Sequence, residues 1–157
     1  MNTVALEEIY LIGLSLKIKT TNENGQSHKD CERLWHEFEK EKYAAMIPGK
    51  LSDEILGVYH GYEGDSTKPF SYFIGCKVQA GTVVPAGLNS LTIPAGPYHK
   101  ITVKGKMPDC MVNAWKEIWV TDIARTYQVD FEVYDERSKD WNNAEVEVYL
   151  SVKDVVK

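Results

Sequence analysis

The sequence has few of the features that accompany nucleic-acid binding or membrane insertion. Its 157 residues include 18 Lys and Arg against 23 Asp and Glu, giving a net charge of −5 with no basic cluster. A nucleic-acid surface needs concentrated positive charge, so we expect no direct nucleic-acid partner. No apolar run approaches the roughly 20 residues that span a bilayer, and residues 1–5 do not resemble a signal peptide. We therefore expect a cytoplasmic protein without membrane attachment.

Cysteine and catalytic motifs are also scarce. Cys31, Cys76 and Cys110 are odd in number, far apart and not arranged as CxxC, which predicts buried free thiols in a reducing compartment. The four histidines are scattered, and the sequence has no phosphate-binding loop, HExxH, GxSxG or zinc-spaced Cys/His cluster. We therefore expect no metal, no cofactor and no catalytic residues, which favours a binding protein over an enzyme.

Hydrophobic patterning predicts a strand, a helix and two further strands in the first half of the chain. Alternation indicates a strand over 9–18, and two more strands are predicted over 55–62 and 70–78. Between them, Leu34, Trp35 and Phe38 form an apolar stripe at helical spacing. Ser27 or Asp30 is the expected helix cap. The helix should end before Pro48, because the residue preceding a proline disfavours the α conformation.

The second half repeats this order after the link 81–89. A strand over 91–103 is broken at Pro94 and Pro97, which places it at a sheet edge or a bend. Pro108 suits the first turn of a helix that carries Trp115 and Trp119, and strands follow over 129–135 and 144–152. We therefore predict an α+β fold, a single domain over 1–157 made of two β-α-β-β repeats (about 5–80 and 88–155). About eight mostly antiparallel strands should carry two helices.

The segment 129–135 contains the most informative carboxylate. Strand alternation places Phe131 and Val133 on one face and Glu132 and Tyr134 on the other. If the apolar face packs on the helices, Glu132 lies on an exposed face of the sheet and has no special role. Alternatively, the face of Glu132 is a groove lined by aromatic side chains. The residues alone leave both interpretations open.

Aromatic residues are numerous enough to line such a groove, since the chain holds nine Tyr, four Trp and four Phe. A carboxylate among aromatic faces is suited to an organic cation, because Coulomb attraction and cation–π contacts then act together. Trp115 and Trp119 lie one turn apart on one helix, although such a stripe also suits core packing. The candidate ligand-binding residues are Tyr59, Tyr98, Trp115, Trp119, Glu132 and Tyr134.

Three motifs occur in an order that resembles a known family. They are Pro-Ala-Gly-Pro-Tyr at 94–98, the helix that carries Trp115, and Phe-Glu-Val-Tyr at 131–134. Together they resemble the GyrI-like, or AraC-type, effector-binding domains, over nearly the whole chain. These domains occur at the C-termini of multidrug-responsive regulators and also as free-standing proteins. No helix-turn-helix segment precedes residue 9, which resembles the free-standing form.

The resemblance implies a duplicated fold with a central groove that binds bulky, often cationic or lipophilic, small molecules. It also implies that Glu132 lies at the floor of that groove. We therefore expect a free-standing binding protein for lipophilic, cationic aromatic compounds. Two alternatives remain open: a protein-interaction or inhibitor module with a protein partner, and a hydrolase of reactive electrophilic natural products that uses the same pocket. A haem carrier is disfavoured, because no histidine is suitably placed.

Overall fold

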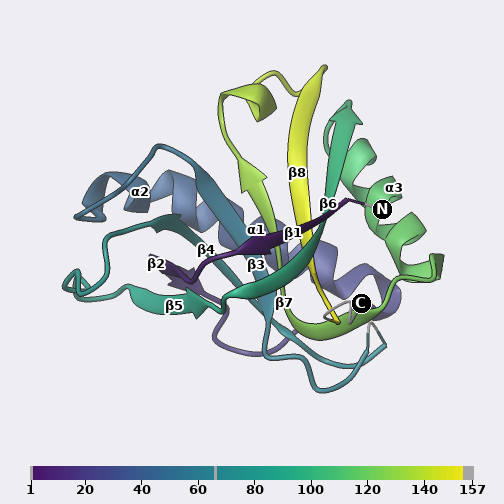
Figure 1. Cartoon of the computed structure of the whole chain (residues 1–157). Coiled ribbons are helices and arrows are strands. Elements are labelled where there is room, and N and C mark those ends of the chain that lie inside the picture. Colours follow the sequence, from purple (N-terminus) through teal and green to yellow (C-terminus); the bar gives the residue numbers. More distant parts are fainter. Residues whose placement is uncertain (1, 66, 154–157) are drawn as a thin grey trace.

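A computed structural model describes residues 2–65 and 67–153. Eight strands form one curled antiparallel sheet in the order β1-β6-β8-β7-β3-β4-β2-β5 (Figure 1). This confirms the α+β class and the strand number expected from the sequence. The strands are β1 (Thr3–Leu6), β2 (Ile9–Ser15), β3 (Ile55–His60), β4 (Ser71–Lys77), β5 (Asn89–Ile93), β6 (Gly96–Gly105), β7 (Arg125–Tyr134) and β8 (Ala144–Val152).

Two long helices accompany the sheet, as predicted. They are α1 (Gln26–Lys40) and α3 (Asp109–Val120), and a single turn, α2 (Tyr43–Met46), follows α1. Short 3-10 turns, η1 (Glu23–Gly25) and η2 (Glu136–Ser138), precede α1 and follow β7. Across the described residues, no helix is both long enough and apolar enough to cross a membrane.

Strands of the two halves of the chain occupy matching positions on either side of the centre of the sheet. The central pair is β3 with β7, flanked by β4 and β8 and then by β2 and β6. The outermost strands are exchanged between the halves, because β1 pairs with β6 and β5 pairs with β2. The N-terminal strand β1 therefore lies along the β6 edge of the sheet, and only residues 7 and 8 connect it to β2 near the opposite edge (Figure 1). This symmetry supports the prediction of two repeats, and we expect residues 5–80 and 88–155 to superpose.

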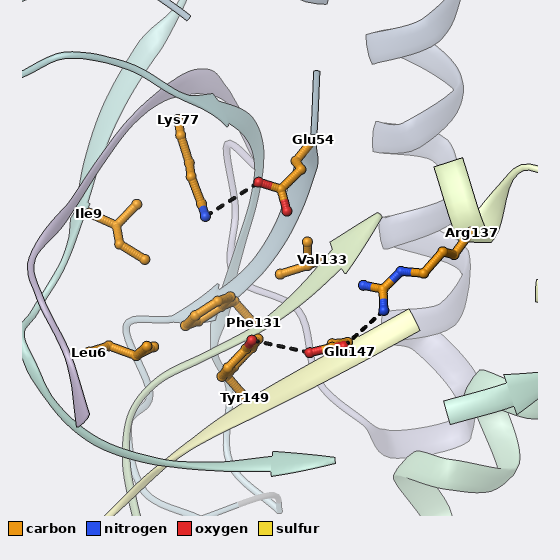
Figure 2. Close-up of a pocket in the computed structure, with 9 residues that line it drawn as sticks. All are labelled: Leu6, Ile9, Glu54, Lys77, Phe131, Val133, Arg137, Glu147 and Tyr149. Carbon is orange, nitrogen blue, oxygen red and sulfur yellow. Dashed lines mark hydrogen bonds and ion pairs between the residues drawn. The ribbon is translucent and has the colours of Figure 1, made fainter. Parts of the chain in front are cut away.

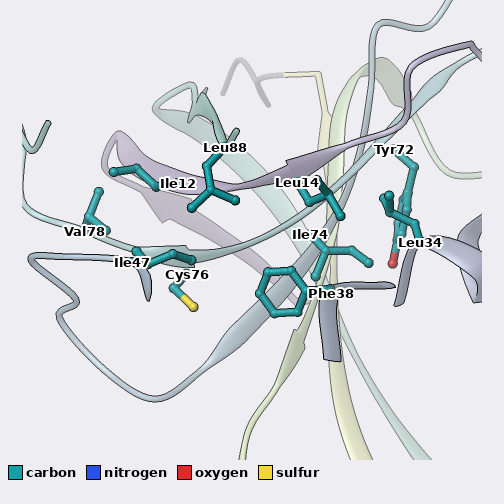
Figure 3. Close-up of a cluster of buried hydrophobic side chains, with 10 residues drawn as sticks. All are labelled: Ile12, Leu14, Leu34, Phe38, Ile47, Tyr72, Ile74, Cys76, Val78 and Leu88. Carbon is teal, nitrogen blue, oxygen red and sulfur yellow. The ribbon is translucent and has the colours of Figure 1, made fainter. Parts of the chain in front are cut away.

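Both faces of the sheet are buried, which explains the absence of a simple polar face. On one face, α1 covers an apolar cluster with Phe38 (Figure 3), and α3 covers a second cluster that includes Ile118. On the other face, Phe131 and Val133 pack in a third cluster with residues of β1, β5 and β6. Glu132 therefore faces the helices and does not lie on an exposed face of the sheet.

Two local predictions differ from the structure. Neither Ser27 nor Asp30 caps α1; Gly25 occupies the N-cap position with a positive φ of 70°, and Asp30 accepts a hydrogen bond from Thr20 instead. The strand expected from residue 129 begins at Arg125, and its pairing with β8 shifts register between Arg125 and Asp130. This irregular stretch contains no clean alternation, so the sequence pattern did not reveal it.

Candidate functional site

Glu132 lies buried on the helix-covered face of the central strand pair, and only 2% of its surface is exposed. Its Oε2 accepts hydrogen bonds from the indole Nε1 of Trp115 at 2.6 Å and from the hydroxyl of Tyr59 at 3.0 Å. Its Oε1 accepts one from the hydroxyl of Tyr134 at 2.6 Å. The donors come from α3, β3 and β7, so Glu132 joins the two halves of the chain.

Burial raises the pKa of Glu132 above its ordinary value, and the three hydrogen bonds oppose this rise. Within the described ranges, no Lys, Arg or His lies at salt-bridge distance from the carboxylate. Burial, and then the charge of Glu132, raise the pKa of Tyr59 and of Tyr134, so both remain hydroxyl donors. Among the described residues, the Glu132 carboxyl therefore has hydrogen-bond donors but no counter-charge.

The aromatic rings around Glu132 form two contacting pairs. Trp115 meets Tyr59 with ring centroids 4.9 Å apart, and Trp35 on α1 meets Tyr134 at the same separation. All four residues are partly exposed, whereas the carboxylate between them is buried. The carboxylate is therefore more deeply buried than the four aromatic residues around it.

Gly57 lies directly opposite Glu132 in the β3–β7 pair. A Cβ added to Gly57 would lie 2.2 Å from the hydroxyl oxygen of Tyr72 and 3.3 Å from Oε1 of Glu132. The Tyr72 hydroxyl, which extends from β4, thus fills the place that a side chain at position 57 would take. There it accepts a hydrogen bond from the indole Nε1 of Trp35 at 2.8 Å.

Tyr72→Phe should destabilise the protein by about 0.5 to 1.5 kcal/mol, because the Trp35 indole loses its acceptor. Tyr10→Phe is the matched control, since the Tyr10 hydroxyl binds Glu8 at the surface. Urea denaturation should show a lower midpoint for the first variant and an almost unchanged midpoint for the second. Equal midpoints for the two variants would contradict a structural role for the buried hydroxyl.

A sequence model of the family "Cass2: integron-associated effector binding protein" matches residues 3–152. The chain belongs to this family. It is a GyrI-like effector-binding domain, as its motifs indicated, and the family relationship supports binding of a small molecule. The family match and the eight-stranded sheet both extend over nearly the full chain.

Relatives of this effector-binding domain cover about three quarters or more of it. A Bacillus subtilis (strain 168) protein named as a transcriptional regulator, YobU, is 27% identical over 124 residues, which span 76% of this chain and 78% of YobU. The Vibrio cholerae integron cassette protein has a TM-score of 0.70 at 24% identity, covering 97% of this chain and 95% of that one. SAV2435, whose structure contains tetraphenylphosphonium, has a TM-score of 0.77 at 18% identity, covering 97% and 93%. The two structural matches show a shared fold.

The structure of this effector-binding domain groups four of the six predicted site residues: Tyr59, Trp115, Glu132 and Tyr134. The prediction for Tyr98 is wrong. Tyr98 lies on the opposite face of the sheet, with its ring against Phe131 and its hydroxyl donating to the carbonyl of Pro94. Trp119 is also outside the group, since it lies in the last turn of α3 and is 40% exposed.

Three residues near Glu132 were absent from the predicted site: Trp35, Tyr72 and Cys31. Trp35 could have been found, because it belongs to the apolar stripe of the first helix, as Trp115 does in the second. Cys31 lies one turn before Trp35 on α1. Burial, and then the negative charge of Glu132, raise the pKa of the Cys31 thiol, so it stays protonated. All three cysteines are free.

A separate cavity of about 90 Å³ lies on the other face of β7, beneath Phe131 and Val133 (Figure 2). Its charged groups are already paired. Lys77 lies 3.5 Å from Glu54, and Arg137 lies 3.0 Å from Glu147. The cavity thus offers no uncompensated charge, in contrast to the site at Glu132.

Proposed function

We propose that this effector-binding domain binds a lipophilic organic cation between α1 and α3, with Glu132 as its counter-charge. The main support is a buried carboxylate that is surrounded by aromatic rings and has no basic partner among the described residues. Each ring face in contact with a cation contributes about 0.5 to 2 kcal/mol, and more when water is excluded. A permanent cation would supply the positive charge that the described chain does not.

The neighbouring carboxylate on the same face of β7 supports this assignment. Asp130 is completely buried, two residues before Glu132, and is paired with Arg125 at 2.6 Å. The described residues therefore provide a cation for Asp130 and none for Glu132. Burying an unpaired charge costs free energy, so the presence of one at Glu132 favours a functional role for this residue.

The comparisons fit the same proposal. SAV2435, which shares the fold, has been seen with tetraphenylphosphonium, a permanent lipophilic cation. YobU is named as a transcriptional regulator, which favours a sensing role for a bound molecule over storage alone. For this chain we infer that it senses a small organic cation by binding it.

Affinity for a permanent cation should depend on pH through Glu132. Because burial raises the pKa of Glu132, the carboxyl becomes neutral at a higher pH than an exposed glutamate does. Affinity should be constant well above that pKa and should fall by about tenfold per pH unit below it, with release of one proton on binding. Burial keeps the pKa values of the surrounding hydroxyls and thiol high, so Tyr59, Tyr72, Tyr134 and Cys31 stay neutral over this range.

Titration calorimetry with benzyltrimethylammonium, in buffers of different ionisation enthalpy, tests this directly. The neutral control is neopentylbenzene, which has the same shape and should bind without pH dependence. Identical pH profiles for the two molecules, or tighter binding of the cation as the pH falls, would rule out Glu132 as the counter-charge.

A further inference from the structure

The hydrogen-bond donors around Glu132 are shared unevenly between its two oxygens. Among the described residues, Oε2 accepts from both Trp115 and Tyr59, whereas Oε1 accepts from Tyr134 alone. A carboxylate has about four acceptor positions, two on each oxygen, so Oε2 is saturated and Oε1 retains one. The positive ends of the donor dipoles also gather at Oε2, where they oppose a further positive charge. The potential that favours a cation is therefore stronger beside Oε1.

The two tryptophans differ in what their N–H groups contact. The Nε1–H of Trp115 points at Glu132, so the positive edge of that indole faces the carboxylate. The Nε1–H of Trp35 points instead at the hydroxyl of Tyr72, which borders Oε1 across Gly57. The Trp35 ring also contacts Tyr134, the single donor to Oε1. Trp35 thus lies on the Oε1 side without directing its N–H at the charge.

We propose that the ligand binds in one orientation, with its cationic centre on the Oε1 side against Trp35 and Tyr134. Its uncharged part then extends towards Trp115 and Tyr59. The matching ligand class is an amphipathic monocation that carries its charge at one end and an aromatic group at the other. Of the two tryptophans, Trp35 contributes more to the preference for charged over neutral ligands, and Tyr72 positions it. This inference rests on the proposed cation site at Glu132.

Orientation can be measured by NMR with benzyltrimethylammonium bound to the labelled full chain. The indole resonances of Trp35 and Trp115 are assigned from Trp35→Leu and Trp115→Leu. Nuclear Overhauser contacts from the N-methyl protons should be stronger to the Trp35 ring, and contacts from the phenyl protons should be stronger to the Trp115 ring. The reverse pattern, or equal contacts to both rings, would overturn the orientation.

The same variants provide an independent affinity test against neopentylbenzene, the neutral molecule of the same shape. Trp35→Leu should lower the affinity ratio of charged to neutral ligand by about 2- to 30-fold, because it removes a cation–π contact. Trp115→Leu should weaken both ligands and change the ratio less. A ratio that responds to Trp115 and not to Trp35 would also overturn the proposal.

The result separates this inference from the proposed function. If benzyltrimethylammonium shifts no resonance of Trp35, Trp115 or the tyrosines beside Glu132, the cation site itself is wrong and the orientation is wrong with it. If the cation binds there with its N-methyl groups against Trp115, the site is correct and only the orientation fails.

Discussion

Glu132→Gln should weaken binding of benzyltrimethylammonium by about 5- to 150-fold, which corresponds to about 1 to 3 kcal/mol. The substitution removes the negative charge that lies between the four rings, while the side chain keeps nearly the same shape. Binding of neopentylbenzene should change little, because it depends on apolar contact and not on charge. Titration calorimetry of both ligands with both proteins gives the four affinities that are needed.

The variant should fold, because the amide can satisfy the same partners. Its oxygen can replace Oε2, where Trp115 and Tyr59 donate, and its NH2 can replace Oε1 once the Tyr134 hydroxyl turns to accept. Removing an uncompensated buried charge should leave the unliganded protein at least as stable as the parent. Equal losses of affinity for the two ligands would mean that Glu132 has only a structural role. Unchanged affinity for both would place the binding site elsewhere.

Local periodicity was sufficient to predict much of this site. Alternation along 129–135 placed Glu132 and Tyr134 on one face, and helical spacing placed Trp115 on the covered side of its helix. Pattern alone could not decide whether that face was exposed. The decision depends on α1 and α3 packing on the same face as Glu132, which is a property of the whole fold.

The errors arose where position depends on contacts distant in sequence. Tyr98 alternates correctly along β6, but its face relative to Glu132 follows from the pairing of β6 with β8 and of β8 with β7. Trp119 has the spacing of a buried residue, yet it is 40% exposed, whereas the adjacent Ile118 packs in the buried cluster beneath α3. Tyr72 reaches the site only because Gly57, on the adjacent strand, leaves space for its hydroxyl.

The pair of Asp130 and Arg125 was also invisible to the sequence pattern, because the register shift in β7 brings the two together. Asp130 Oδ2 accepts from Arg125 at 2.6 Å and from the Tyr62 hydroxyl at 2.6 Å, and Oδ1 accepts from the backbone N–H of Ser151 at 2.9 Å. The side chains of Asp130 and Arg125 are 0% and 4% exposed. The pair joins β7 to β8 and lies on the same strand face as Glu132.

Asp130→Asn should therefore lower the free energy of unfolding by about 3 to 5 kcal/mol, because it leaves the Arg125 guanidinium buried without its counter-charge. If the amide oxygen keeps the bond to Ser151, the amide NH2 faces the Arg125 nitrogen as donor against donor. Asp135→Asn is the matched control, since its partner Arg137 is 42% exposed and a surface pair contributes about 1 kcal/mol or less.

Urea denaturation of the parent, Asp130→Asn, Asp135→Asn and Glu132→Gln gives the decisive comparison. Two isosteric changes lie two residues apart on one face of β7, and they should act oppositely. Asp130→Asn should unfold far more easily, whereas Glu132→Gln should retain its stability and lose cation affinity. This contrast follows from the partners, because Asp130 already has a cation within the fold and Glu132 has none among the described residues. A loss below about 1 kcal/mol for Asp130→Asn would mean that the buried pair does not anchor β7 to β8.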